Sequence, residues 1–546
     1  MDLITPGNVL SLLSASAFAL SVVVYYRYKS IYSYWSKRNI KGPEPYYFIG
    51  NLLQVYNDNK NNFKDQCIQK YGRVFGLYEG SKPVLYVADL DLYTRICVKD
   101  FEVFPNHNRG EFITELQKKN LFFQADDQWR RLRALMSPTF TSGKIRRMIK
   151  LLDACVDDLV STFMELVDGQ GGPKPINMKE TYSLFTMDAI TTCCYALKLE
   201  RIKSVTDLKK MASRNEFVAD AMRLFEFSIT RLSIATVMPT FIRKMIGFET
   251  FPIKNTKPLI EKVTKIIEAR RKSPKKLDDY LQSLIDAKLD QHVELDHLDD
   301  KENHHAALTN ESIQSDQRKL VLSVDNQSNG KSAFLDEAEV VSNAAFLIMV
   351  GLETTASLLT SCSCTLAFHQ DIQERLRNEI RKITKADEGE PVFDYEAITS
   401  CAYLDAVISE TLRLVPAVLN MDRSNIQDYH IEKYNLTLPA GSKVVLMMKE
   451  IMLNPEHWPE PNKFDPERFM PENKHKIVPG SYCPFGLGPR HCLGMRFSLT
   501  ETKLALAKMI LKFKFTPTKG TQFPPAIKPG LGLRRFENPL VDVQLL

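Results

Sequence analysis

The chain has 546 residues and a formal net charge of +6, with 44% hydrophobic and 25% charged residues. Such a composition is typical of a globular protein with a large apolar core. The net charge is small for this length and gives no indication of nucleic-acid binding. No composition break divides the chain into separate domains.

The first segment, 1–28, contains an uncharged run, Val9–Tyr26. As a helix, a run of this length spans about 27 Å, close to the roughly 30 Å of a bilayer core. A cleaved signal peptide would carry its basic residues before the apolar run, whereas Arg27, Lys29 and Lys37 follow it. We therefore expect an uncleaved single-pass anchor, with the N-terminus in the lumen and the bulk of the chain on the cytosolic side.

A basic, proline-containing hinge over 29–45 is predicted after the anchor, because its last residues, Lys41-Gly-Pro-Glu-Pro45, stop a helix. Two β-like runs, Arg73–Tyr78 and Pro83–Ala88, then predict a small hairpin. From Asp89 onward helical periodicity dominates. The fold class expected from these patterns is mainly α with small β-sheets.

Several helices are predicted in the first half of the chain. Trp129 and Arg133 lie four residues apart at the start of a basic helix and therefore share one face. Further helices are predicted over Lys179–Lys198 and Glu216–Lys244. The segment 217–251 is rich in Phe, Leu, Ile and Met, so it forms a packed core, a membrane-facing surface or a substrate channel.

The segment 290–331 differs from its surroundings. It is polar and charged and contains no aromatic residue, which predicts a disordered surface insertion. Four histidines in it admit a metal site, but a solvated loop is the simpler interpretation. They are His292, His297, His304 and His305.

One long helix is predicted over Asp336–His369. It would be about 50 Å long, and because it is apolar on all sides it should be buried. Glu353 and Thr354 lie in its middle, where polar groups are costly unless they are used. Gly351 weakens the helix by about 1 kcal/mol relative to alanine and leaves room for a ligand. For Thr355, a hydroxyl bonded within the helix remains an alternative.

Two patterns near the C-terminus carry further chemistry. Glu410 and Arg413 are three residues apart on one helix face, where a surface ion pair is the default interpretation. The loop Phe485–Gly494 holds three glycines and one cysteine, Cys492, and leads into an apolar helix over Leu499–Ile510. A thiol near a helix start is favoured as thiolate, which suits a metal ligand better than a structural cysteine.

This loop resembles the haem-binding loop of the cytochrome P450 family, the haem-thiolate monooxygenases. The family signature, Phe-x-x-Gly-x-Arg-x-Cys-x-Gly, is matched in full by Phe485, Gly488, Arg490, Cys492 and Gly494. The stretch Ser137–Met148 further resembles the family-three, drug-metabolising animal members. The resemblance implies a cytochrome P450 fold, with one large haem domain over 46–546 behind an anchor in the endoplasmic reticulum membrane.

The resemblance also assigns roles to residues. The cofactor would be haem b, with Cys492 as the axial ligand of its iron. Gly351 would lie over the haem, and Glu353 and Thr354 would be the acid–alcohol pair that delivers protons. The position of Val350 usually holds a small residue, so valine here narrows the pocket or shifts the helix.

Two further sets of residues are implied. Glu410 and Arg413 would form a buried structural triad with Arg468, which lies in Pro466-Glu-Arg-Phe469. The haem carboxylates would be held by basic and aromatic side chains. These are Arg109, Trp129, Arg133, Arg423 and Arg490.

The activity implied is that of an oxidoreductase that inserts one oxygen atom into a lipophilic xenobiotic, sterol or fatty acid. Pocket candidates are Ala417, Val418 and Leu419. Because no dinucleotide-binding fingerprint is present, the electrons are expected from another protein. The resemblance implies NADPH–cytochrome P450 reductase as that donor and admits cytochrome b5 as another. Candidates for the basic docking face are Arg130, Arg131, Lys144, Arg146 and Arg147.

Two other functions belong to the same family. One is a haem-thiolate isomerase or dehydratase that works without dioxygen or a reductase. The other is a haem protein without catalytic activity. The intact Glu353–Thr354 pair argues against both, since it is the part of the site that delivers protons.

Overall fold

The computed structural model describes residues 6–546 apart from 59–61, 109–114, 168–171, 199–219, 221–228, 239, 249–252, 278, 288–333, 388–389 and 393. The predicted insertion 290–331 with its histidines lies outside the described residues, and so do Arg109 and part of the segment 217–251.

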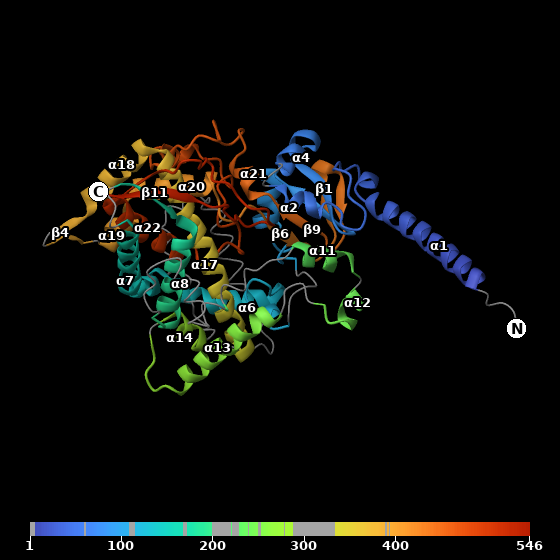
Figure 1. The fold of residues 1–546 in the computed structure, drawn as a ribbon, viewed down its shortest axis with the longest axis horizontal. Helices are drawn as coiled ribbons and strands as arrows, with labels where there is room; N and C mark the ends of the chain where they lie inside the picture. Colours follow the sequence, from blue (N-terminus) through green and yellow to red (C-terminus); the bar gives the residue numbers. More distant parts are fainter. Residues whose placement is uncertain are drawn as a thin grey trace.

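Helices make up most of the fold (Figure 1). In chain order the α-helices described are α1 Pro6–Tyr32, α2 Leu52–Tyr56, α4 Phe63–Tyr71, α5 Leu90–Thr94, α6 Asp126–Met136, α7 Ser142–Val167, α8 Met178–Tyr195, α11 Ile229–Val237, α12 Thr240–Met245, α13 Ile253–Lys272, α14 Tyr280–Ile285, α17 Glu337–Phe368, α18 Gln370–Ile383, α19 Tyr395–Ser400, α20 Ala402–Leu414, α21 Met448–Met452 and α22 Met495–Lys512. The long helix predicted over Asp336–His369 is confirmed as α17. The segment predicted as one helix over Glu216–Lys244 is helical in its described part, but it forms two helices, α11 and α12.

Helix α17 is the central element of the helical part (Figure 1). A capping box starts it, in which the Asp336 carboxylate accepts from the Glu339 amide at 2.7 Å and the Glu339 carboxylate accepts from the Asp336 amide at 2.9 Å. Helices α8, α20 and α22 pack against α17. From Thr355 to Ala367 every residue is buried, whereas Val350 is 36% exposed. The middle of this core helix therefore opens onto a space that its C-terminal half lacks.

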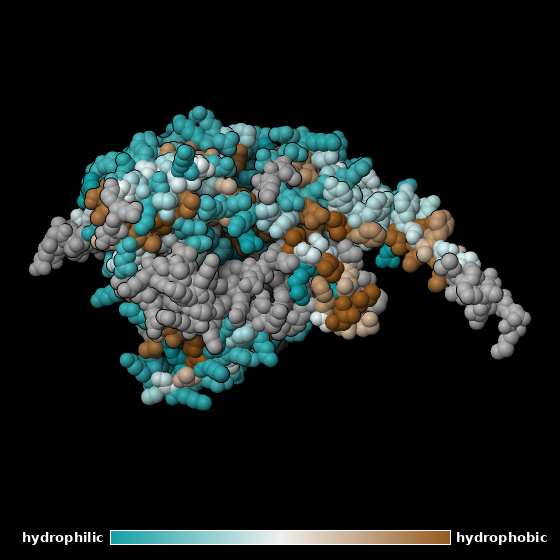
Figure 2. All heavy atoms as spheres, viewed as in Figure 1, coloured by the Kyte–Doolittle hydropathy of each residue, from teal (hydrophilic) through white to brown (hydrophobic). Residues whose placement is uncertain are grey.

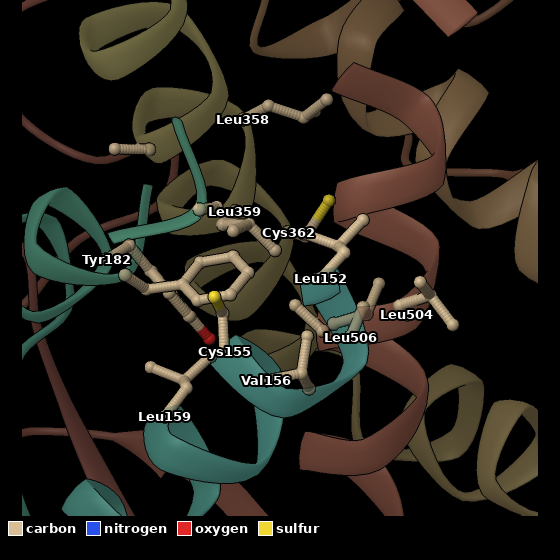
Figure 3. Packing of buried hydrophobic residues seen from close by; sticks show 14 of the residues in the cluster. Leu152, Cys155, Val156, Leu159, Tyr182, Leu358, Leu359, Cys362, Leu504 and Leu506 are labelled. Carbon is tan, nitrogen blue, oxygen red and sulfur yellow. The ribbon is translucent and has the colours of Figure 1, made fainter. Parts of the chain in front are cut away.

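The main core lies between α7, α8, α17 and α22. Figure 3 shows how Leu152 and Val156 of α7, Leu359 of α17 and Leu506 of α22 pack together. Of the part of the chain that the structure describes, α17 alone is long and apolar enough to cross a membrane, and 56% of that apolar window is buried in the fold. Such burial is typical of a helix in the core of a protein, so we interpret α17 as a core helix.

The β-strands form small sheets. The first has the order β1-β2-β9-β6, with β1 Val74–Glu79, β2 Lys82–Val87, β9 Lys443–Leu446 and β6 Met421–Ser424. Strands β1 and β2 are antiparallel with Val74 opposite Val87, which confirms the predicted hairpin. A second sheet has the order β10-β11-β3, with β10 Phe513–Pro517, β11 Leu540–Leu545 and β3 Lys174–Asn177. The described residues also form two hairpins, β4 Lys385–Asp387 with β5 Glu390–Val392, and β7 Tyr429–Ile431 with β8 Leu436–Leu438.

Helix α1 extends away from the body of the protein (Figure 1). Its side chains Leu13, Phe18 and Leu20 are more than 60% exposed. It continues to Tyr32, four residues past the predicted boundary at 28. Just beyond it, Trp35 is buried and its indole N–H donates to the Leu77 carbonyl at 2.9 Å, which attaches this end of the helix to the first sheet.

Candidate functional site

The loop that holds Cys492 is shaped by glycines. Gly486 and Gly488 have φ of 78° and 75°, a region that glycine adopts without strain. A Cβ on Gly488 would lie 1.8 Å from the Cys97 carbonyl oxygen, so no side chain fits at that position. The Cys492 amide donates to the Phe485 carbonyl at 2.9 Å and closes the loop. Helix α22 begins three residues after the cysteine.

Cys492 differs from the other nine cysteines of the chain, which are all buried, because its side chain is exposed. Burial by the surrounding protein nevertheless raises its pKa, and the amides of Gly494 and Met495 and the charge of Arg133 only partly oppose this. The thiol therefore opens onto a space within the fold rather than onto the outer surface. The thiolate that the helix start was predicted to favour is opposed by burial, which the sequence did not reveal.

Helix α6 brings Trp129 and Arg133 to this loop. The Arg133 guanidinium donates to the His491 carbonyl at 3.1 Å and lies 3.2 Å from Nε2 of the His491 ring. Burial lowers the pKa of Arg133 to about 10, with Cys492 acting in the opposite direction. Burial and Arg133 together lower the pKa of His491 to about 3, so this imidazole is neutral. A cation is thus held one residue from the accessible thiol.

Arg490 uses its hydrogen bonds on the backbone. Its guanidinium donates to four carbonyl oxygens, at distances of 2.7 to 3.5 Å. The carbonyls belong to Pro105, Leu121, Phe122 and Gln124. The same guanidinium lies 4.3 Å from the centre of the Trp129 ring. Arg490 therefore ties the cysteine loop to the two chain segments in front of α6.

Arg423 of β6 is fully buried. Its Nη1 donates to the Asp422 carbonyl at 2.9 Å and lies 3.1 Å from Nδ1 of His107. Its Nε and Nη2 have no hydrogen-bond partner among the described residues. A buried guanidinium with two unused donors is costly alone and suits an anionic carboxylate, which it binds through two parallel hydrogen bonds.

His107 was not predicted from the sequence. Its ring lies between Arg423 and Asp422, and it stacks on Phe122 at 4.4 Å between ring centres. Burial and the charge of Arg423 lower its pKa to about 4, so it is neutral. The resemblance implied Arg109, which lies outside the described residues, whereas a histidine in an irregular segment gives no pattern to detect.

The middle of α17 carries the predicted acid–alcohol pair. The Glu353 carboxylate is 3.2 Å from Nζ of Lys179, and the Thr354 hydroxyl donates to the Val350 carbonyl at 2.6 Å. Thr355 lies on another side of the helix, and its hydroxyl is 3.0 Å from that of Ser498. This contact joins α17 to α22 six residues after Cys492. A Cβ on Gly351 would lie 2.7 Å from Cδ1 of Ile190, so the missing side chain allows α8 to pack closely.

The structure brings Glu410, Arg413 and Arg468 together. Arg413 donates to both carboxylate oxygens of Glu410, at 2.7 and 2.8 Å, and neither side chain is exposed. Nε of Arg468 lies 3.4 Å from the same carboxylate. The Asp465 amide adds a fourth contact at 3.0 Å. Despite these partners burial raises the pKa of Glu410.

The prediction that Arg131 belongs to the basic docking face is wrong. Arg131 is buried, forms an ion pair with Glu339 of α17 and donates to the Phe334 carbonyl at 3.0 Å. Since it joins α6 to the start of α17, it is not available to a partner protein. Arg130 pairs with Glu102, whereas Arg146 and Arg147 are exposed on α7.

The comparisons with known proteins point to one family. The family model for "Cytochrome P450" matches residues 40–539. The chain is 33% identical to cytochrome P450 3A11 of Mus musculus over 550 residues, covering 99% of this chain and 97% of that protein. It is 32% identical to cytochrome P450 3A6 of Oryctolagus cuniculus over 545 residues, covering 99% and 97%. Cytochrome P450 3A29 of Sus scrofa is 31% identical over 533 residues, covering 96% and 94%.

The cofactor of this family is haem b, and the residues present fit it. An accessible thiol suits its iron, and the unused donors of Arg423 suit one of its carboxylates. Arg133, Arg423 and Arg490 are buried, which provides the low-dielectric surroundings that a porphyrin needs. The chain therefore belongs to the cytochrome P450 family and is a haem-dependent monooxygenase.

Proposed function

We propose that this monooxygenase hydroxylates or epoxidises lipophilic substrates, either xenobiotics, sterols or fatty acids. One atom of O2 enters the substrate and the other leaves as water, so each turnover takes up two electrons and two protons. The electrons come from NADPH through NADPH–cytochrome P450 reductase, with cytochrome b5 as a further donor. The observation that carries the proposal is Cys492, the one accessible thiol of the chain, at the start of α22 beside Arg133.

Cys492 is the proposed axial ligand. When bound, the haem supplies dioxygen binding and O–O bond cleavage, which an electron-rich thiolate favours. The neighbouring Arg133 and the amides of Gly494 and Met495 stabilise negative charge on the sulphur. Phe485, Gly488 and Gly494 shape the loop that presents it.

The haem carboxylates are proposed to bind Arg423, Trp129 and Arg133. Arg423 supports this best, because its two unused donors would then be paired. Arg490 acts mainly through the backbone carbonyls that it already binds, and its guanidinium packs over the Trp129 ring. Arg109 is a further candidate from the sequence alone.

Glu353 and Thr354 are proposed to deliver the protons. Because the Thr354 hydroxyl donates its own proton to the Val350 carbonyl, its oxygen lone pairs remain free to accept a hydrogen bond from water. Glu353 is half-buried on the same segment and supplies a carboxyl group, which is a usual general acid or base in enzymes. Gly351 supports this segment by letting α8 approach it.

An apolar substrate is proposed from the side chains along the open part of α17. Val350 is the most exposed of them, and the Phe346 ring lies 5.7 Å from that of Phe122. Of the predicted pocket residues, Ala417 and Val418 are half-buried, whereas Leu419 is 3% exposed and belongs to the core. An apolar lining binds by burial and so selects lipophilic compounds.

Attachment to the endoplasmic reticulum membrane through α1 is also proposed. The apolar run and the basic residues after it support an anchor with the catalytic part in the cytosol. Exposed apolar side chains gather at α11 and α12 (Figure 2), where Met245 is 77% and Ile246 is 55% exposed. Figure 1 places these helices on the same side of the molecule as α1, so both would face the bilayer.

The docking face for the reductase is proposed at the start of α7, where Arg146 and Arg147 are exposed and Lys144 is half-buried. Basic residues here would attract an acidic partner surface and raise the association rate more than the affinity. Reversal of the two exposed charges should therefore slow reduction and make its rate less dependent on salt.

The test of the proposed function uses the full-length protein with reductase and NADPH. The reduced, carbon-monoxide-bound protein should show the red-shifted Soret band of a thiolate haem, and Cys492→Ala should lose it. A panel of lipophilic compounds should give spin-state shifts and oxygenated products of the expected mass. A Cys492→Ala variant that keeps the band would refute the ligand assignment, and ligand-induced spectral shifts without any oxygenated product would refute the reaction.

A further inference from the structure

Helix α8 contacts the segment 350–354 of α17 at three points. The Ile190 side chain fills the place of the missing Gly351 side chain. The Thr186 hydroxyl donates to the Leu352 carbonyl at 3.1 Å, in a fully buried contact. The third contact is Lys179, whose Nζ donates to the Glu353 carbonyl at 3.1 Å. Successive residues of the segment are thus each held from the same neighbouring helix.

Lys179 makes a second contact that bears on chemistry. Its Nζ lies 3.2 Å from Oε2 of Glu353, and the two side chains are 15% and 20% exposed. An ammonium has three N–H donors, and Glu353 takes two of them, through its carboxylate and its carbonyl oxygen. The lysine therefore fixes both the direction of the Glu353 side chain and the backbone that carries it.

Lys179 is placed firmly enough to do this. It is the second residue of α8, directly after the strand β3. Burial lowers its pKa while the Glu353 charge opposes that effect. At this degree of burial the pair is screened less by water than a surface ion pair, so its geometry is better defined.

We propose that Lys179 is a positioning residue for oxygen activation: it holds the Glu353 carboxylate and its backbone in the arrangement from which protons are delivered. The inference rests on the proposed role of Glu353 and Thr354. Without the lysine the carboxylate turns towards water, proton delivery is no longer directed, and reduced oxygen leaves as hydrogen peroxide. That loss also consumes two electrons and two protons for each O2, so NADPH is oxidised without product.

The experiment compares Lys179→Met, which removes the charge, with Lys179→Arg, which restores a cation. Lys508→Met is the matched control, because Lys508 is 10% exposed and pairs with Asp157 and Asp153 on α7, away from Glu353. Each full-length holoenzyme is first checked for haem content and for the thiolate Soret band. Peroxide released per NADPH is then measured with one substrate, and hydrogen–deuterium exchange is followed in peptides covering 346–358.

We expect Lys179→Met to raise the peroxide fraction by roughly tenfold and to speed exchange in 346–358 by roughly threefold. Lys179→Arg and Lys508→Met should remain near the parent in both measurements. Unchanged coupling in Lys179→Met would overturn the inference, and so would equal uncoupling by Lys179→Met and Lys179→Arg. If the parent itself gives no product, the proposed function fails, but the exchange measurement still tests the positioning of the segment.

Discussion

The Nη1 atom of Arg423 lies 3.1 Å from Nδ1 of His107, in a buried contact between residues 316 positions apart. Because burial and the arginine lower the pKa of His107 to about 4, the imidazole is neutral, and the nearby carboxylate is that of Asp422. The charge of Arg423 is thus available to an anion at its unused Nε and Nη2.

Replacement of this arginine should separate haem binding from folding. Arg423→Leu removes a cation whose charge-assisted hydrogen bonds to a carboxylate are worth about 1.5–3 kcal/mol. Haem retention should therefore weaken by roughly ten- to a hundredfold, while the apoprotein keeps its stability or gains some. Haem content by pyridine haemochrome and the melting temperature of the apoprotein measure the two effects. Equal losses in both would contradict a role in haem binding.

Loss of Glu410 should be severe. Glu410→Ala leaves Arg413 buried without its carboxylate, which costs about 3–5 kcal/mol. Chemical denaturation, or the rate at which the thiolate Soret band is lost on warming, would measure this. The matched control is Glu460→Ala, since Glu460 is 75% exposed and pairs with the exposed Lys463. The control should cost at most about 0.5 kcal/mol, and similar losses in both variants would argue against a buried triad.

Glu501 of α22 should make stability depend on pH. It is 1% exposed, its Oε1 has no partner among the described residues, and burial raises its pKa well above the ordinary value of 4.5. The folded protein thus keeps a proton that the unfolded chain loses. Stability from this group is full below the unfolded pKa and is lost as the pH rises towards the folded pKa.

The change Glu501→Gln removes that dependence. At about pH 8 the variant should be more stable than the parent by about 1–3 kcal/mol, and the gap should close towards about pH 5. Denaturant titrations at several pH values, without reductase or substrate, would follow it. If the stability of the parent and of the variant changed with pH in the same way, the Glu501 carboxyl group would have a partner in the folded protein.

Replacement of Gly351 by alanine should destabilise the protein unless the Ile190 side chain of α8 moves. Gly351→Ala places a Cβ 2.7 Å from Cδ1 of Ile190, and such overpacking costs about 1–3 kcal/mol, against a helix-propensity gain of about 1 kcal/mol. Ile190→Val removes the clashing carbon. The double variant should recover most of the loss, so unfolding free energies of the four proteins form a double-mutant cycle. An additive cycle would show that the two positions are not in contact.

The parts that the sequence predicted are those with a local signal. Continuous apolar composition over Asp336–His369 was enough to predict α17, and glycine spacing with Cys492 was enough to identify the loop. Two short β-like runs on either side of Glu79-Gly-Ser81 likewise predicted the β1–β2 hairpin. In each case neighbours in the chain are neighbours in the fold.

What the sequence did not reveal depends on contacts between distant segments. Lys179 and Glu353 are 174 residues apart, and no local pattern pairs them. Arg131 reads as one more surface charge in a basic helix, yet Glu339 and the start of α17 bury it. The Cys492 thiol near a helix start suggested an acidic group, whereas burial, which depends on the whole fold, acts the other way.

The four hydrogen bonds of Arg490 do not depend on the side chains of the residues that accept them. All four acceptors are main-chain carbonyls, which every amino acid provides. Mutations at Leu121, Phe122 or Gln124 therefore change side chains but keep the carbonyls that hold this segment to the cysteine loop. Replacement of Arg490 itself would remove all four bonds at once.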